Sequence, residues 1–214
     1  MKIRPHIFCD FDGTITEKDT LVFLSTRLGA GPEFVRGIGE DLRLGRMTLR
    51  EAIDTEMRTI RLGFDEAAAI LQREITLDSG FNTLVEWSER IGIPFTIISA
   101  GFHELIRLFV PAEKYPWVNV LANHVEADPV RGWQCHFRDD GPFGHDKQTS
   151  LREARNRGEY LIFIGDGFSD RQAAEMADEV YAKHSLAVYC REQGIEFHEY
   201  QNLAEVQRRI EESR

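Results

Sequence analysis

The chain has 214 residues, which is more than one typical domain of about 150 residues and fewer than two. Its formal net charge is −10 with no long basic run, so nucleic acid and anionic membranes are not expected partners. The hydrophobic share of 42% and the charged share of 29% are typical of a globular protein and exclude disordered and fibrous classes. We therefore expect one large domain, or a domain that carries an insert.

Two further features bear on location. No apolar run approaches the roughly 18 residues that a membrane span needs, and Asp10 falls where the apolar stretch of a signal peptide would continue. The three cysteines are an odd number and lie far apart, so neither a disulfide framework nor a zinc site is expected. We expect a cytoplasmic protein, and its oligomeric state stays open.

Short apolar runs recur along the chain and predict buried strands, at residues 6–11, 94–99, 160–165 and 179–182. Helical patterns follow at residues 79–91, 102–110 and 170–177, and residues 202–214 form a final predicted helix with Asn202 as its N-cap. Strands that alternate with helices predict an α/β fold with a Rossmann-like parallel sheet.

The interval between the first two strands is far longer than the roughly 30 residues of one βαβ unit. It favours helix at 20–30, 33–44, 48–62 and 64–75, with a capping box from Thr48 to Glu51 and a plausible stop at Gly63. We predict a core of residues 1–16 and 78–214, and a small helical cap of residues 17–77 inserted after the first strand. A second excursion, at 116–145, has the turn signals and short apolar runs of an antiparallel hairpin.

Two acids, Asp10 and Asp12, follow the first strand and precede Gly13-Thr14. They face the same side of an extended chain at the carboxyl edge of the sheet, where α/β proteins bind ligands. Carboxylates this close repel each other unless they hold a cation or share a proton. A hard dication is one interpretation, and an ordinary Asx-turn is the alternative.

A second acidic motif follows the strand at 160–165. Asp166 stands at the matching strand end and completes an oxygen-only set with Asp10 and Asp12, which suits Mg²⁺. Asp170 lies four residues further on, where it contributes to the site or complements the dipole of the next helix.

Two weaker motifs could bind an anion. The hydroxyl of Ser99 and the backbone N–H groups of Ala100 and Gly101 would form an anion-binding corner where a strand meets a helix, although serine is also a common N-cap. Lys147 begins a predicted helix, where a cation opposes the helix dipole unless an anion is present. A solvated surface lysine is the alternative.

In this order and spacing the four motifs resemble those of the haloacid dehalogenase (HAD) superfamily of phosphotransferases, over nearly the whole chain. The resemblance implies that Asp10 is the nucleophile, that Asp12 is the general acid and base, and that Ser99 and Lys147 hold the phosphate. It further implies Mg²⁺ bound by Asp10, the backbone carbonyl of Asp12, and Asp166, with Asp170 supporting these ligands from behind. The expected reaction is hydrolysis of a small phosphorylated metabolite through an aspartyl-phosphate.

The helical insert is similar to the cap of the phosphoserine phosphatase-like branch, and the chain looks closest to the phosphatases of methionine salvage, which act on an enol phosphate. Phosphoserine phosphatases have a Glu and an Arg in the cap for their substrate, whereas the corresponding positions here hold Asp19 and Glu56. Ser169 also replaces the usual Asn of the fourth motif. Alternatives are a phosphoserine phosphatase, another small-metabolite phosphotransferase or phosphomutase, and a receiver-like regulatory module without enzymatic activity.

Overall fold

The computed structural model describes residues 4–213. These form one seven-stranded sheet with strand order β4-β3-β2-β1-β5-β6-β7. All neighbouring strands are parallel except β3 and β4, which are antiparallel. The strands are β1 (Pro5–Cys9), β2 (Phe95–Phe102), β3 (Val118–Glu126), β4 (Gln134–His136), β5 (Tyr160–Gly165), β6 (Glu179–Ala182) and β7 (His198–Glu199). The α/β fold with a parallel core is as predicted.

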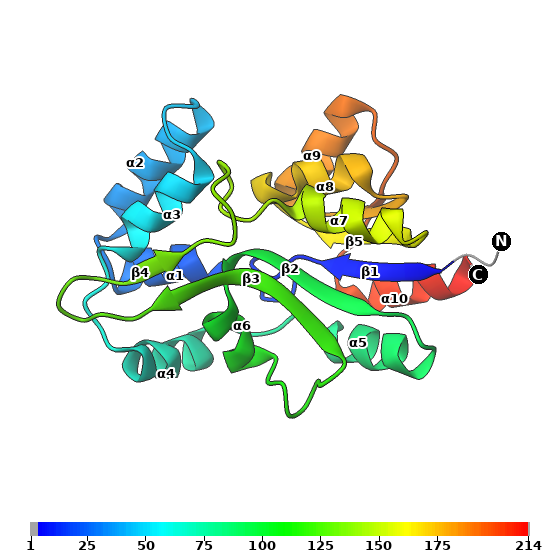
Figure 1. Cartoon of the computed structure of the whole chain (residues 1–214), viewed down its shortest axis with the longest axis horizontal. Coiled ribbons are helices and arrows are strands. Elements are labelled where there is room, and N and C mark those ends of the chain that lie inside the picture. The colour runs from blue at the N-terminus through cyan, green and yellow to red at the C-terminus, as the bar shows by residue number, and fades with distance from the viewer. Residues whose placement is uncertain (1–3, 214) are drawn as a thin grey trace.

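Helices cover both faces of the sheet (Figure 1). On one face lie α5 (Phe81–Arg90), α6 (His103–Phe109) and α10 (Leu203–Glu212), and their apolar side chains join those of β1 and β2 in one buried cluster. On the other face lie α7 (Lys147–Asn156), α8 (Arg171–Met176) and α9 (His184–Gln193), with a second cluster beneath them. A short 3-10 helix, η1 (Phe168–Asp170), precedes α8. The Asn202 side chain accepts from Glu205 N and caps α10 as predicted.

The long interval after β1 is helical. It contains α1 (Thr20–Arg27), α2 (Pro32–Arg43), α3 (Leu49–Met57) and α4 (Phe64–Glu74), in the places where the sequence predicts four helices. The capping box of Thr48 and Glu51 forms. At either end of the interval, Thr16 and Leu77 pair in an isolated antiparallel bridge. The division into a core and a separate cap stays a prediction, since these helices share an apolar cluster with β2, α6 and the β3–β4 hairpin.

Helix α3 ends at Met57, five residues before the predicted end at residue 62. Trp133, the last residue of the loop that joins β3 to β4, accounts for the difference. Its backbone N–H donates to the Met57 carbonyl at 3.2 Å, and its buried indole N–H donates to the Leu62 carbonyl at 2.8 Å. Tertiary hydrogen bonds thus replace the last turn of helix.

The excursion at 116–145 is only partly an antiparallel hairpin. Strand β3 is a full member of the core sheet, parallel to β2 from Phe95↔Val118 onward. Only its last residues, 124–126, pair with β4. The buried side chains of Val118, Val120 and Ala122 pack into the core cluster and hold β3 in the sheet.

Candidate active site

The predicted site residues come together because their strands are neighbours. Strand β1 lies between β2 and β5, and all three are parallel, so their carboxyl ends meet at one edge. Asp10 follows β1, Asp166 follows β5, and Ser99 lies in β2. The Asp10 N–H donates to the Ile164 carbonyl at 2.9 Å, which extends the β1–β5 ladder to the site. One cavity, of about 440 Å³, is lined by all three residues.

Lys147 joins two of the acids beneath the cavity. Its Nζ lies 2.5 Å from Asp10 Oδ1 and 2.6 Å from Asp170 Oδ1, and the three side chains are almost completely buried. Burial raises the pKa of Asp10, and Asp170 adds to this, while Lys147 opposes it. Burial alone would lower the pKa of Lys147, but the two carboxylates outweigh it and raise that pKa. A lone ammonium at the start of α7 is therefore a charge partner of the acidic cluster and not a solvated lysine.

Asp170 organises the turn after β5. Its Oδ2 accepts from Asp166 N at 3.0 Å and from Gly167 N at 2.9 Å, while its Oδ1 receives Lys147. Both oxygens are thus occupied by protein donors. The carboxylate therefore holds the loop and the lysine in place.

The acids also form a plausible metal centre. Oxygen atoms of Asp10, Asp166 and Asp170 all lie within 4.8 Å of one another. Burial, followed by the charge of Asp170, raises the pKa of Asp166 to about 6. Close carboxylates without Cys or His ligands suit a hard cation, so Asp10 and Asp166 fit Mg²⁺, whereas both oxygens of Asp170 already accept from protein donors. The carboxylate of Asp12, the remaining member of the predicted metal set, is not part of this cluster, and the role of its backbone carbonyl stays a prediction.

The Asp12 side chain turns toward the first cap helix. Its Oδ1 accepts from the Thr20 N–H at 2.8 Å and from the Thr20 hydroxyl at 2.6 Å. Its Oδ2 faces Gly101, because a Cβ placed on that glycine would lie 2.7 Å from Oδ2. Burial, and next the charge of Asp19, raise the pKa of Asp12 to about 7. Asp10 and Asp12 therefore have different partners, one ionic and one a hydroxyl and an amide.

The residues of the predicted anion-binding corner lie together at the cavity, but they belong to β2 and do not stand where a strand meets a helix. Gly101 N donates to Ser99 Oγ at 2.8 Å, and Ser99, Ala100 and Gly101 all line the cavity. A side chain at Gly101 would collide with both Asp12 and the Ser99 hydroxyl, at 2.7 and 3.1 Å. Only glycine lets these two groups approach one backbone so closely.

The cap side of the cavity differs from its floor. Its walls are mainly aliphatic, and the acidic exceptions are Glu17, Asp19 and Glu56. Among residues 4–213, no Lys or Arg lines this cavity. The aliphatic lining residues of the cap are Leu21, Val22, Val35, Ile38, Leu42, Leu49, Ala52 and Ile53.

Two of these three acids, Asp19 and Glu56, bond to groups of α1. The Asp19 carboxylate caps α1 by accepting from Val22 N at 2.8 Å. Glu56 Oε2 accepts from the Ser25 hydroxyl at 3.3 Å. Burial raises the pKa of Glu56 to about 7, with Ser25 opposing and Asp19 adding to the rise.

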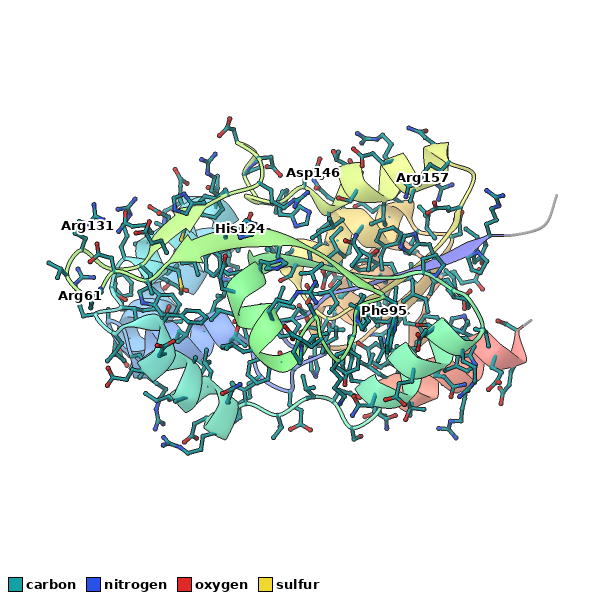
Figure 2. The ribbon with its side chains drawn as sticks, turned by 60° about the horizontal axis from the view of Figure 1, so that its bottom comes forward. Arg61, Phe95, His124, Arg131, Asp146 and Arg157 are labelled. Carbon is teal, nitrogen blue, oxygen red and sulfur yellow. The ribbon has the colours of Figure 1, made fainter. Side chains whose placement is uncertain are left out.

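The cap arginines point elsewhere. Arg58 pairs with Asp54 at 2.7 Å, and Arg46 pairs with Asp41 at 2.5 Å. Figure 2 shows Arg61 near Arg131, at the far end of the β3–β4 hairpin. These exposed arginines do not line the cavity and are therefore not placed to bind an anionic substrate there.

Sequence reasoning missed two residues at the site. Thr20 holds Asp12, and His184 Nδ1 lies 3.4 Å from Asp166 Oδ2 at the cavity edge. His184 directly follows the β6 region, so its place after a parallel strand was the available signal. For Thr20 the sequence carries no such signal, because only the turn at Gly13, where φ is +78°, brings α1 back to Asp12.

Comparison with known proteins places this geometry in a family. Residues 7–175 match the haloacid dehalogenase-like hydrolase family. The chain is 30% identical to a polyol phosphate phosphatase from Saccharomyces cerevisiae, over 95% of this chain and 91% of that protein. It is 26% identical to a 2-hydroxy-3-keto-5-methylthiopentenyl-1-phosphate phosphatase from Bacillus cytotoxicus, over 96% and 95%. Among solved structures, a phospho-aspartyl intermediate analogue of phosphoserine phosphatase superposes with a TM-score of 0.73 and 18% identity, over 97% and 99%.

The chain therefore belongs to the haloacid dehalogenase-like hydrolases. Within that family it is a phosphomonoester hydrolase with the α/β fold of the phosphoserine phosphatase-like branch. In the described residues, no helix is long and apolar enough to cross a membrane.

Proposed function

We propose that the protein is a Mg²⁺-dependent phosphatase that hydrolyses a small phosphomonoester through an aspartyl-phosphate on Asp10. The observation that carries this proposal is the buried Asp10–Lys147–Asp170 network, which reaches the cavity through Asp10, beside Asp166. It combines a carboxylate nucleophile, a fixed ammonium and a candidate metal centre at one point. These three groups are what catalysis of phosphoryl transfer mainly requires, because it depends on positioning and on stabilising charge.

In the first half-reaction, a carboxylate oxygen of Asp10 attacks phosphorus and the bond from phosphorus to the ester oxygen breaks. The leaving oxygen takes the proton of Asp12, whose Oδ2 faces the Ser99–Gly101 turn where the phosphate would lie. The Lys147 ammonium offsets negative charge at Asp10 and the phosphoryl group. Bound Mg²⁺, held by Asp10, Asp166 and the Asp12 carbonyl, would supply further positive charge to the phosphoryl oxygens.

In the second half-reaction, Asp12 removes a proton from water as the water oxygen bonds to phosphorus. The bond between phosphorus and Asp10 breaks, which restores the Asp10 carboxylate and protonated Asp12 and releases orthophosphate. The second acid supports an enzyme over a receiver-like module, because a regulatory switch needs an aspartyl-phosphate that survives.

For the substrate, we propose a small phosphorylated metabolite without a carboxylate. Glu17, Asp19 and Glu56 line the cavity, and no Lys or Arg of the described residues does, so this side offers no positive charge to pair with the carboxylate of phosphoserine. The aliphatic walls suit an apolar chain, as in the methionine-salvage enol phosphate, and the free oxygen of Glu56 suits a substrate hydroxyl, as in a polyol phosphate. These are the substrate classes named for two of the related proteins.

A phosphate-release screen tests the proposal. The panel comprises polyol phosphates, the methionine-salvage enol phosphate and phosphoserine, each with Mg²⁺ and with EDTA, and Asp10→Asn is the matched inactive control. We expect Mg²⁺-dependent release from a carboxylate-free substrate, with kcat/KM at least tenfold above that for phosphoserine. Release that persists in EDTA would contradict the metal assignment. A preference for phosphoserine would contradict the interpretation of Glu56.

A further inference from the structure

The turn that presents Ser99 and Gly101 leaves the regular hydrogen-bond ladder. Strand β2 pairs with β3 through Ile98↔Leu121, and the pairing resumes with a register shift at Phe102↔Asn123. The backbone between these points is buried, so its carbonyl oxygens need hydrogen-bond donors from outside the β2–β3 ladder. Two side chains from distant segments fill this role.

His145 and Asn123 bind consecutive carbonyls of this turn. His145 Nδ1 lies 2.8 Å from the Ser99 oxygen, and Asn123 Nδ2 donates to the Ala100 oxygen at 2.7 Å. His145 is 3% exposed and Asn123 is fully buried. Because a carbonyl only accepts, the His145 proton must reside on Nδ1, which leaves Nε2 buried without a hydrogen-bond partner. Burial lowers the pKa of His145 to about 4, so this neutral form persists at ordinary pH.

Holding a carbonyl also fixes the next N–H, because the two point in opposite directions across a planar trans peptide. The contact with His145 therefore directs the Ala100 N–H away from His145, on the opposite side of the peptide. The contact with Asn123 likewise sets the Gly101 N–H, which donates to Ser99 Oγ. With that lone pair of Oγ engaged, the Ser99 hydroxyl proton is left for a group in the cavity.

Both side chains are themselves tightly held. Asn123 Oδ1 accepts from the Arg138 N–H at 3.0 Å, which fixes its amide orientation. His145 lies two residues before Lys147, and Asp146 N between them donates to Asp139 Oδ2 at 2.7 Å. One short segment thus places both the lysine that contacts Asp10 and the histidine that contacts the Ser99 carbonyl.

We propose that Asn123 and His145 are positioning residues that orient the Ser99–Gly101 turn toward the phosphoryl group. This inference rests on the proposed phosphatase function, and neither side chain lines the cavity beside the nucleophile. Without these contacts the two peptides would be free to rotate. The predicted loss is then in kcat and in the affinity for a phosphoryl mimic, more than in recognition of the rest of the substrate.

The central test compares two substitutions of His145. Asn places its amide nitrogen near the Nδ1 position and keeps the donor, whereas Leu removes it. With the Mg²⁺-loaded protein, we measure kcat, KM and inhibition by orthovanadate. We expect His145→Leu to lower kcat and vanadate affinity by about 10²-fold, the usual loss for a misplacement near 1 Å. His145→Asn should recover most of both, and KM should change less than threefold in either.

His6→Leu is the matched control, since His6 is also buried and hydrogen-bonds β2 at its other end, through Thr96 at 2.8 Å. It should lower thermal stability without changing kcat. If His145→Leu does not fold, the comparison is made between His145→Asn and His145→Gln. Gln places its amide nitrogen nearer the Nε2 position, so the kcat of this variant should fall. Asn123→Leu should behave as His145→Leu does.

The outcomes separate the two proposals. If the wild-type protein neither hydrolyses phosphomonoesters nor binds vanadate, the proposed function fails. If the wild-type protein does both, two results would show that the positioning role is wrong. One is that His145→Leu keeps its kcat and vanadate affinity, and the other is that His145→Asn and His145→Gln have equal kcat and equal vanadate affinity. A kcat loss in His145→Leu that the Asn variant rescues, with His6→Leu unaffected, supports it.

Discussion

The two sides of the cavity differ in charge and in packing. Its floor is formed at the carboxyl ends of β1, β2 and β5, with Lys147 and Asp170 behind it, and its cap wall is formed by α1, α2 and α3. On the floor, Asp10, Lys147 and Asp170 are almost fully buried, and the lysine bonds both acids within 2.6 Å. On the cap wall, Glu56 has a single 3.3 Å hydrogen bond from Ser25, and its surroundings are aliphatic side chains and the acid Asp19. The charges of the floor are paired and fixed around the position proposed for the phosphoryl group, whereas the wall has few polar contacts.

From this contrast we expect the floor to determine catalysis and the wall to determine substrate selectivity. Fixed charges contribute to catalysis when they are already placed where charge develops, which describes the floor. Apolar walls with one or two polar groups set which molecule enters, which describes the cap. Changes on the floor should therefore act on turnover, and changes on the wall on selectivity and on stability.

The largest expected effect comes from the nucleophile. Asp10→Asn should reduce phosphate release by about 10⁴-fold or more, the scale of loss when a nucleophile is removed. Thermal stability should not fall, because the change removes one of several mutually repelling buried acids. Phosphate-release kinetics and a melting curve check both parts, and a variant within tenfold of wild type would exclude Asp10 as nucleophile.

Lys147→Met should damage turnover and folding together. It leaves Asp10 and Asp170 buried without their ammonium, which typically costs about 3–5 kcal/mol of unfolding free energy. Turnover should fall by about 10²-fold or more, as when one preorganised charge-stabilising group is lost. Denaturant unfolding and kcat measure the two losses. An unchanged stability would mean that the buried network is not formed as described.

Gly101→Ala is a milder test of the floor. The added methyl group would meet Asp12 Oδ2 at 2.7 Å and must displace it, so we expect kcat to fall by about 10²-fold. Gly37→Ala is the matched control, because nothing lies near its added Cβ on α2. That control should keep full activity and gain up to about 1 kcal/mol in stability. Equal kinetics of the two variants would argue against close packing of Asp12 on the turn.

The smallest effect concerns the wall and is a pH dependence. The pKa of Glu56 is raised to about 7 from an ordinary value of 4.5, so the folded state binds its proton more tightly than the unfolded state. The contribution of Glu56 to stability is therefore present below pH 4.5 and is lost as pH rises to about 7. Asp19 and Ser25 are the groups that act on it.

Replacing Glu56 with Gln should remove this slope. Unfolding free energies measured from pH 4.5 to 8 should show the variant gaining stability relative to wild type as pH rises. Glu66→Gln, on the exposed side of α4, is the matched control. Parallel pH profiles for wild type and Glu56→Gln would contradict the burial of this carboxyl in the cavity wall.

How well the sequence predicts each side follows from the same contrast. Asp10, Asp166 and Ser99 could be predicted because parallel strands bring their carboxyl ends together whatever the loops do. Lys147 was detectable as a cation at a helix start. Asn123 and His145 were not, since their role depends on a register shift between β2 and β3 that no local pattern encodes.

The wall was harder to predict because it depends on how helices pack. Helix α2 shows its apolar stripe in the sequence, but the sequence does not say that Val35, Ile38 and Leu42 face the cavity and not a core. The early end of α3 has the same origin. Trp133, which lies in the β3–β4 hairpin about 70 residues further along the chain, donates to the carbonyls of Met57 and Leu62. Tertiary contacts of this kind override local helix preference.

The most direct test of the account is to trap the covalent intermediate. Protein mixed with Mg²⁺ and substrate is quenched in acid and reduced with borohydride, which converts an acyl-phosphate at an aspartate to homoserine, and peptide mass spectrometry locates it. We predict homoserine at position 10 alone, dependent on both Mg²⁺ and substrate. Steady phosphate release with an unmodified Asp10, or with homoserine at another acid, would contradict the account.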